Sequence, residues 1–169
     1  ADDDGYILKA TNEDSKSSDN DLVIAIEGSV SSMDPANIPD TNAISATRGV
    51  YETLVSFDEN QELTGKLAES WEVSDDSLTF KLRQGVKFQD GTDFNAAAVK
   101  ANYDRVVNKD NNLRQRRTFI VTNEDGSETP RVDSIETPDD YTLVIKLTQA
   151  WAPFINRLTQ FCIISPAAL

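Results

Sequence analysis

The sequence contains no histidine and a single cysteine, Cys162, among its 169 residues. Without histidine, this chain alone cannot form a Ser-His-Asp triad, a Cys-His pair or a histidine-ligated metal site. With one cysteine, an internal disulfide and a zinc cluster of several thiolates are also excluded. Carboxylates are therefore the main candidates for chemistry, and we expect no metal and no cofactor.

Basic residues are also scarce, since 16 lysines and arginines face 29 acidic residues and the formal net charge is −13. A field of this sign repels phosphate groups, so we expect no nucleic-acid partner and no binding to anionic membranes. No apolar run approaches the roughly 18 residues that a membrane-spanning helix needs. The absence of a signal-peptide pattern predicts a mature or trimmed form.

Residues 1–21 are acidic, rich in Ser and Asn, and nearly free of apolar side chains. Burial there cannot offset the entropy of ordering the chain, so the composition predicts a flexible tether. The continuous apolar run 22–26 then predicts a buried strand. A short helix is expected over 43–50, with Asn42 as its N-cap.

The stretch 67–91 has the alternation of a half-buried antiparallel hairpin. Leu78, Phe80 and Leu82 alternate with polar residues and follow a first strand that contains Trp71. We expect a third strand to resume around Phe88 before a turn at Asp90-Gly91. A second hairpin with the same alternation is predicted over 132–147.

Apolar residues return at helical spacing after Asn95, which is a good N-cap. The pattern predicts an amphipathic helix that ends at Asn108, followed by a basic island at 114–117 and a loop over 123–130. A short helix over 153–158 and a buried strand over 161–164 complete the chain. The mixture of elements predicts an α/β (α+β) fold.

Several short motifs add a specific resemblance. They are Met33-Asp34-Pro35, YETLV (51–55), LAESWEVSDD (67–76), FKLRQGVKFQDG (80–91), FNAAAV (94–99), DDYTLVIKL (139–147) and IISPAAL (163–169). In this order and spacing, the set closely resembles the family-5 extracellular solute-binding proteins, which bind oligopeptides, dipeptides or nickel for ABC importers. The resemblance covers the chain from about Leu22 to Leu169.

The resemblance implies a type II periplasmic-binding-protein-like fold, of which this chain would be an N-terminal lobe fragment with an inserted antiparallel-sheet subdomain. Residues 22–51 with 163–169 would form part of the first lobe, and residues 52–162 the inserted subdomain. The implied function is capture of peptides for a membrane permease, without catalysis. The protein would be extracellular, periplasmic or anchored to the cell surface by a lipid on a cysteine that this chain lacks.

The resemblance also implies ligand contacts. By position, residues 39–42 resemble a family loop whose backbone runs along the bound peptide: Pro39, Asp40, Thr41 and Asn42. Arg116 and Phe119 match an arginine and aromatic pair that lines the site in the nickel-binding branch. Cys162 stands where that branch has an arginine, which favours a peptide ligand over the alternative of a nickel-chelate or opine-type ligand.

Two other classes of function remain as alternatives. An acid/base hydrolase would use paired carboxylates, for which the candidates are Asp75-Asp76, Asp90 and Asp139-Asp140. Neighbouring residues on a tight turn point apart and sit in water, so the pattern disfavours this class. A surface adhesin-type binding module is the second alternative.

Overall fold

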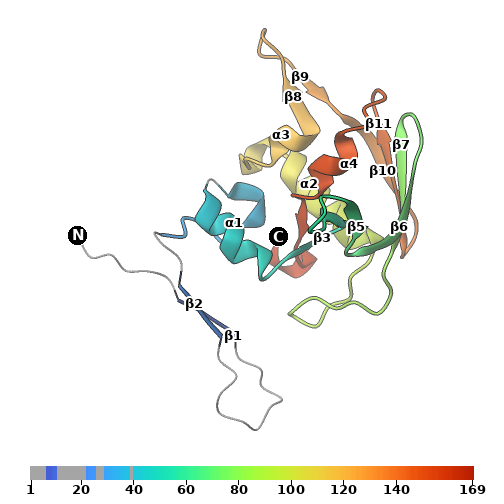
Figure 1. Cartoon of the computed structure of the whole chain (residues 1–169). Coiled ribbons are helices and arrows are strands. Elements are labelled where there is room, and N and C mark those ends of the chain that lie inside the picture. The colour runs from blue at the N-terminus through green and yellow to red at the C-terminus, as the bar shows by residue number, and fades with distance from the viewer. Residues whose placement is uncertain (1–6, 11–21, 26–28, 39) are drawn as a thin grey trace. The chain divides into compact units, whose positions relative to one another are not determined.

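The computed structural model describes residues 7–10, 22–25, 29–38 and 40–169 (Figure 1). The chain divides into two compact units, Ala1–Val50 and Tyr51–Leu169. Residues 163–169, which the resemblance grouped with 22–51, belong to the second unit, where Ile163 pairs with Glu52. The assignment of these units to lobes of a larger protein stays a prediction.

The first unit contains an antiparallel pair of strands, β1 (Ile7–Ala10) and β2 (Leu22–Ala25), with Ile7 opposite Ala25. Strand β2 confirms the strand expected from the apolar run. Strand β1 lies inside the segment expected to be a tether, so that expectation is wrong for these four residues, because a partner strand satisfies their backbone. The rest of residues 1–21 lies outside the described residues.

The first unit also contains the 3-10 turn η1 (Pro35–Asn37) and helix α1 (Thr41–Arg48). Asp40, not Asn42, caps this helix: its backbone is extended and its carboxylate accepts a hydrogen bond from the Ala43 N–H at 2.8 Å. The expected cap was therefore two residues too late. Both residue types suit the N-cap, and the backbone conformation decides between them.

A four-stranded antiparallel sheet organises the second unit, in the order β10-β11-β7-β6 (Figure 1). Its strands are β6 (Ala68–Val73), β7 (Ser77–Leu82), β10 (Val132–Asp139) and β11 (Thr142–Leu147). The two predicted hairpins are confirmed, and β7 pairs with β11 to join them, placing Phe80 opposite Leu143. Both of these side chains are fully buried.

Smaller elements surround this sheet. The strands are β3 (Glu52–Thr53), β4 (Val55–Phe57), β5 (Leu63–Gly65), β8 (Ile120–Thr122), β9 (Glu128–Pro130) and β12 (Cys162–Ile163). The helices and turns are η2 (Lys109–Asn111), α3 (Arg116–Phe119), α4 (Phe154–Leu158) and η3 (Pro166–Ala168). Strand β9 occupies part of the expected loop 123–130. The expected third strand near Phe88 is absent from the described chain, where Lys87 makes only an isolated bridge to Asp93.

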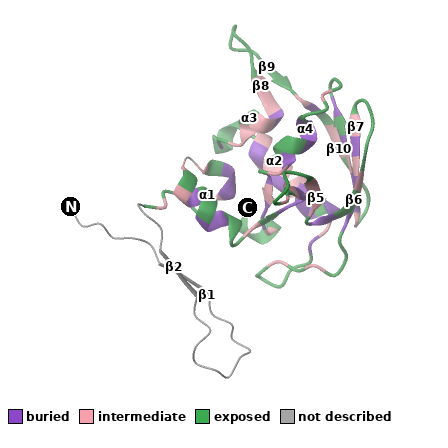
Figure 2. Cartoon of the chain, viewed as in Figure 1, coloured by how far each residue is buried: buried purple, intermediate pink, exposed green. Residues whose placement is uncertain are grey.

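Helix α2 (Ala96–Val107) confirms the amphipathic helix, and the Asn95 side chain caps it by accepting from the Ala98 N–H at 2.9 Å. Its buried face is visible in Figure 2. Asn102 on that face is also buried, and its amide exchanges two hydrogen bonds with the backbone of Ile164, at 2.8 and 3.1 Å. The helix is thereby tied to the segment that follows β12.

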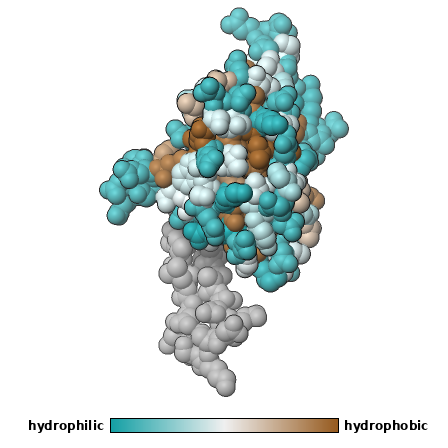
Figure 3. Space-filling view, turned by 90° about the vertical axis from the view of Figure 1, so that its right-hand side faces the viewer, coloured by the Kyte–Doolittle hydropathy of each residue, from teal (hydrophilic) through white to brown (hydrophobic). Residues whose placement is uncertain are grey.

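The outer face of the sheet is polar. Because side chains alternate along a strand, the residues between the buried positions of β7 and β11 point away from the core, among them Lys81 and Lys146. The face of the molecule drawn in Figure 3 is accordingly mostly hydrophilic, with smaller hydrophobic areas between. The packing of the second unit therefore depends on one face of the sheet.

The central position of Phe80 gives a test of this core. We expect Phe80→Ala to lower the free energy of unfolding by about 3–5 kcal/mol, because a fully buried aromatic side chain leaves a cavity. Val73→Ala, in the partner strand of the same hairpin and 53% exposed, is the control and should change it little. Urea unfolding followed by circular dichroism measures both, and equal losses would contradict the assigned core.

Candidate functional site

Within the predicted loop 39–42, Asp40 is the N-cap of helix α1, and Thr41 and Asn42 are its first residues. Asp40 accepts hydrogen bonds from Ser31 Oγ at 2.5 Å and from the Ala43 N–H, and these bonds, that of Ser31 first, lower the pKa of its carboxyl group. Thr41 and Asn42 form the first helical turn, and Thr41 is exposed. Pro39 lies outside the described residues. Asp40 is thus an ionised capping group, and a role in ligand binding stays a prediction.

Arg116 is held in a two-pronged ion pair. Its Nη1 and Nη2 atoms donate to the two carboxylate oxygens of Glu128, at 2.5 and 2.8 Å, and its Nε donates to the Val107 carbonyl at 2.9 Å. Paired in this way, Arg116 has a raised pKa and Glu128 a lowered one, mainly through their mutual hydrogen bonds. One side chain therefore links α3, β9 and the end of α2.

Phe119 lies in the core of the second unit. Its ring is 1% exposed and makes edge contacts with Tyr103, Phe161 and Phe154, at centroid separations of 5.1, 5.0 and 6.1 Å. Such contacts stabilise the packing beyond simple burial. The ring has no free surface for a ligand, so the predicted role of Phe119 as a ligand contact does not fit its position.

Cys162 is half-buried in β12, opposite Thr53 of β3. The residues just before it contact the segment that holds Arg116 and Phe119: the Phe161 ring touches Phe119, and the Gln115 side chain donates to the Gln160 carbonyl at 2.6 Å. The segment 40–42 belongs to the first unit.

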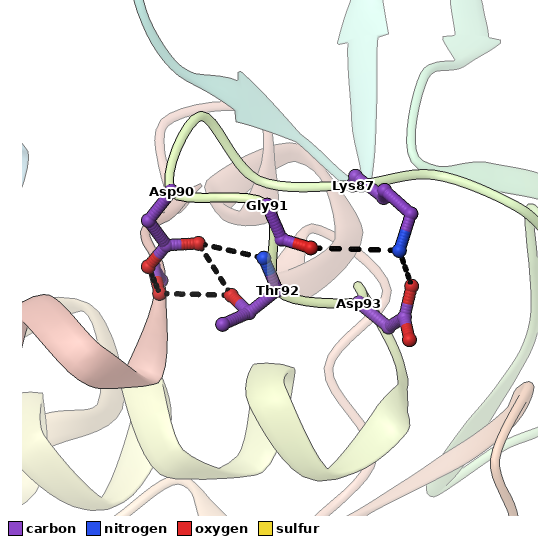
Figure 4. Close-up of polar contacts among 6 residues, drawn as sticks. Lys87, Asp90, Gly91, Thr92 and Asp93 are labelled. Atoms are coloured by element: carbon purple, nitrogen blue, oxygen red, sulfur yellow. Dashed lines mark hydrogen bonds and ion pairs between the residues drawn. The ribbon is translucent and has the colours of Figure 1, made fainter.

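The structure contains a polar cluster around Asp90 that the sequence analysis did not predict (Figure 4). The carboxylate of Asp90 accepts hydrogen bonds from Ser165 Oγ and from Thr92 Oγ1, the latter at 2.6 Å. Beside it, Lys87 Nζ donates to Asp93 at 2.5 Å and to the Gly91 carbonyl at 3.4 Å. The turn is thereby fastened to a residue 75 positions further along the chain.

The hydrogen bonds from Ser165 first, and then from Thr92, lower the pKa of Asp90. The sequence pattern marks Asp90-Gly91 only as a turn, and Gly91 does adopt the positive φ of 84° that favours glycine. No local signal points to the partner. The cluster orders the chain where η3 begins.

Metal and membrane features can be judged only for the described part of the chain. There, no group of three or more acidic or cysteine side chains is arranged to hold a metal ion. Within the same residues, none of the helices is both long and apolar enough to cross a membrane.

This arrangement of sheet and helices defines the class of protein. It matches the solved periplasmic binding protein AgaA in complex with agropinic acid from A. tumefaciens R10, with a TM-score of 0.73 and 29% identity over 84% of this chain and 28% of that one. It also matches DppA from Helicobacter pylori in complex with the peptide STSA, with a TM-score of 0.64 and 29% identity over 82% and 29% of the two chains. The chain therefore has the fold of one part of a type II periplasmic-binding-protein-like structure.

The sequence comparisons give the family. The chain is 39% identical over 153 residues to the glutathione-binding protein GsiB of Escherichia coli K12, covering 88% of this chain and 28% of that protein. The model of the bacterial extracellular solute-binding proteins, family 5 Middle, matches residues 62–168. The chain belongs to this family, and it spans about 28% of the length of the curated relatives it matches.

The Arg116–Glu128 pair is testable by a double-mutant cycle. We expect Arg116→Ala and Glu128→Ala each to destabilise the chain, and the double variant to lose less than the sum, because the two charges hold each other at 2.5 Å. Arg117→Ala in the same helix is the control. Thermal unfolding of the parent, the two single variants and the double variant measures the coupling. Strictly additive losses of stability would contradict a stabilising interaction between Arg116 and Glu128.

The hydrogen bonds of the Asp90 cluster predict that the stability of the fold depends on pH. Because the folded pKa of Asp90 lies below its ordinary value of 3.8, ionised Asp90 stabilises the fold above that value, and the contribution disappears as the pH falls through the folded pKa. Asp90→Asn should therefore melt at a lower temperature than the parent at pH 7, with the difference shrinking in acid. Asp75→Asn, on an exposed turn, is the control, and a difference independent of pH would contradict this account.

Proposed function

We propose that this chain is part of a solute-binding protein that captures a short peptide or a peptide-like ligand outside the cytoplasm and delivers it to the permease of an ABC importer. The similarity to GsiB, a protein named for binding glutathione, carries this proposal. Glutathione is itself a small peptide, and the matched DppA structure holds the peptide STSA. A lipid anchor that holds the protein at the cell surface stays part of the proposal.

The positions of the predicted ligand residues favour a peptide over a nickel chelate. The nickel alternative depended on Arg116 and Phe119 facing the ligand, but Arg116 already binds a carboxylate of the chain itself and Phe119 is buried. Cys162 also stands where the nickel-binding branch carries an arginine. The structure thus supplies no exposed guanidinium–aromatic pair at these positions.

A binding role also agrees with the state of the carboxylates. A general acid at neutral pH needs a raised pKa, as in a desolvated site. Hydrogen bonds instead lower the pKa of Asp90, and those of Thr142 and Tyr141 lower the pKa of Asp139. The direction of both shifts is the opposite of what a general acid at neutral pH needs, which favours a binding role for this chain over a hydrolase.

The start of α1 is the proposed ligand-facing segment within this chain. Asp40 fixes the helix start through its cap, which orders the backbone of the first helical turn. An ordered backbone suits recognition of a peptide main chain, which gives affinity with little dependence on side chains. In a two-lobed protein such a segment supplies one wall of the site and the second lobe supplies the other.

Isothermal titration with glutathione and mixed short peptides tests this proposal. We expect the full-length protein that contains this sequence to bind one of these ligands at micromolar concentration or tighter, and the 169-residue chain to bind it at least about tenfold more weakly. One wall provides fewer contacts, whereas the cost of immobilising the ligand is met in full.

Two outcomes would count against it. Full affinity in the 169-residue chain would show that the whole site lies within these residues. Failure of the full-length protein to bind any of the peptides, with heat released on adding a nickel chelate instead, would reverse the choice of ligand.

A further inference from the structure

A small hollow lies where the β8–β9 hairpin meets the end of strand β11. Its walls include Val121 of β8, Arg131 after β9, Leu147 at the end of β11, and Trp151. The hollow is small and partly open to solvent. It can receive at most one polar group, with the rest of that molecule outside.

The side chain of Arg131 is the charged group of this hollow. Its guanidinium carbon lies 4.2 Å from the centre of the Trp151 ring, so the cation is stacked on an aromatic face. Its Nε atom is buried and has no hydrogen-bond partner among the described residues. Arg131 is therefore held by stacking, unlike Arg116, whose guanidinium is taken up by Glu128.

The walls of the hollow favour an anion. None of the residues that line it is acidic, although the chain as a whole carries a net charge of −13. The apolar surfaces of Val121 and Leu147 reduce hydration around the guanidinium, which strengthens its attraction for a negative group. Gln149 also lines the hollow, and its amide is a neutral hydrogen-bond donor.

The backbone around Arg131 is fixed before any ligand arrives. The Arg131 N–H donates to the Phe119 carbonyl at 2.8 Å, and the Arg131 carbonyl accepts from the Thr148 N–H at 3.0 Å. Thr148 Oγ1 donates in addition to the Pro130 carbonyl at 2.8 Å. Since these bonds join the two hairpins, little ordering remains to oppose binding.

We propose that this hollow binds a single carboxylate group, with Arg131 as the cationic partner and Gln149 as a second donor. A planar guanidinium presents parallel N–H groups that match the two oxygens of a carboxylate. The small size of the hollow limits the bound part to the carboxylate, which an acidic side chain or the free C-terminus of a peptide would supply. None of the residues that line the hollow belongs to the segment proposed for the transported ligand, so either proposal can fail without the other.

The two tryptophans of the chain, Trp71 and Trp151, make a direct test possible. In a nitrogen-15 spectrum each indole N–H gives one signal, which a Trp71→Phe variant assigns. We expect N-acetylalanine, which has only a C-terminal carboxylate, or N-acetylglutamic acid α-amide, which has only a side-chain carboxylate, to shift the Trp151 signal saturably. The Trp71 signal should not move. The compound that binds more tightly shows whether the hollow prefers a C-terminal or a side-chain carboxylate.

Variants make the test specific. Arg131→Gln should raise the dissociation constant about tenfold or more, Arg131→Lys should raise it less because the charge remains, and Gln149→Ala should weaken binding without altering the stack. Arg83→Gln, at an exposed arginine outside the hollow, is the matched control and should bind like the parent. Near-ultraviolet circular dichroism checks that each variant keeps its fold.

Three results would overturn the proposal. They are no saturable shift of the Trp151 signal with either carboxylate, an equal shift with uncharged N-acetylalanine amide, and unchanged affinity in a folded Arg131→Gln variant. A response to inorganic phosphate without a response to the carboxylates would likewise exclude carboxylate recognition.

Discussion

The pairing of β7 with β11 is the contact on which the second unit depends. It joins two hairpins that are each local in sequence, and it places Leu78 opposite Ile145 and Phe80 opposite Leu143 on the buried face. An isolated two-stranded hairpin is only marginally stable, whereas four strands with one apolar face can support a core. Helix α2 has a buried face of its own, and Asn102 on that face anchors the closing segment at Ile164.

Two arginines show how one residue type acquires different roles in a strongly acidic chain. Arg116 uses three nitrogen atoms on Glu128 and the Val107 carbonyl, which makes it a structural link between elements. Arg131 stacks on Trp151 beside a hollow that no carboxylate of the described residues lines. Sequence alone places Arg116 among the candidate ligand contacts, because it stands in a motif, and gives no reason to select Arg131.

Membership of family 5 of the extracellular solute-binding proteins agrees with what the residues permit. The chain lacks histidine, its described carboxylates with shifted pKa values are all lowered, and its hydrogen-bonded turns serve to order backbone. These hydrogen bonds give the described carboxylates a structural role in turns and helix caps. Because the chain spans about 28% of its curated relatives, the proposed transport function depends on surfaces beyond those described.

The sequence by itself determined the local elements and the family. Alternation predicted both hairpins, Asn95 and the apolar spacing predicted α2, and the ordered motifs pointed to family 5. These patterns can be recognised in a sequence because strand and helix periodicity and capping preferences involve only a few neighbouring residues.

Only the tertiary structure decided the partnering of β7 with β11, the burial of Phe119 and the bond between Asp90 and Ser165. It also decided that Asp40 caps α1 in place of Asn42, and that Ile7–Ala10 forms a strand. The physical reason is that such contacts join residues far apart in the chain or choose between two locally acceptable conformations. Their free energies depend on how the whole unit packs, and local sequence periodicity contains no information about that packing.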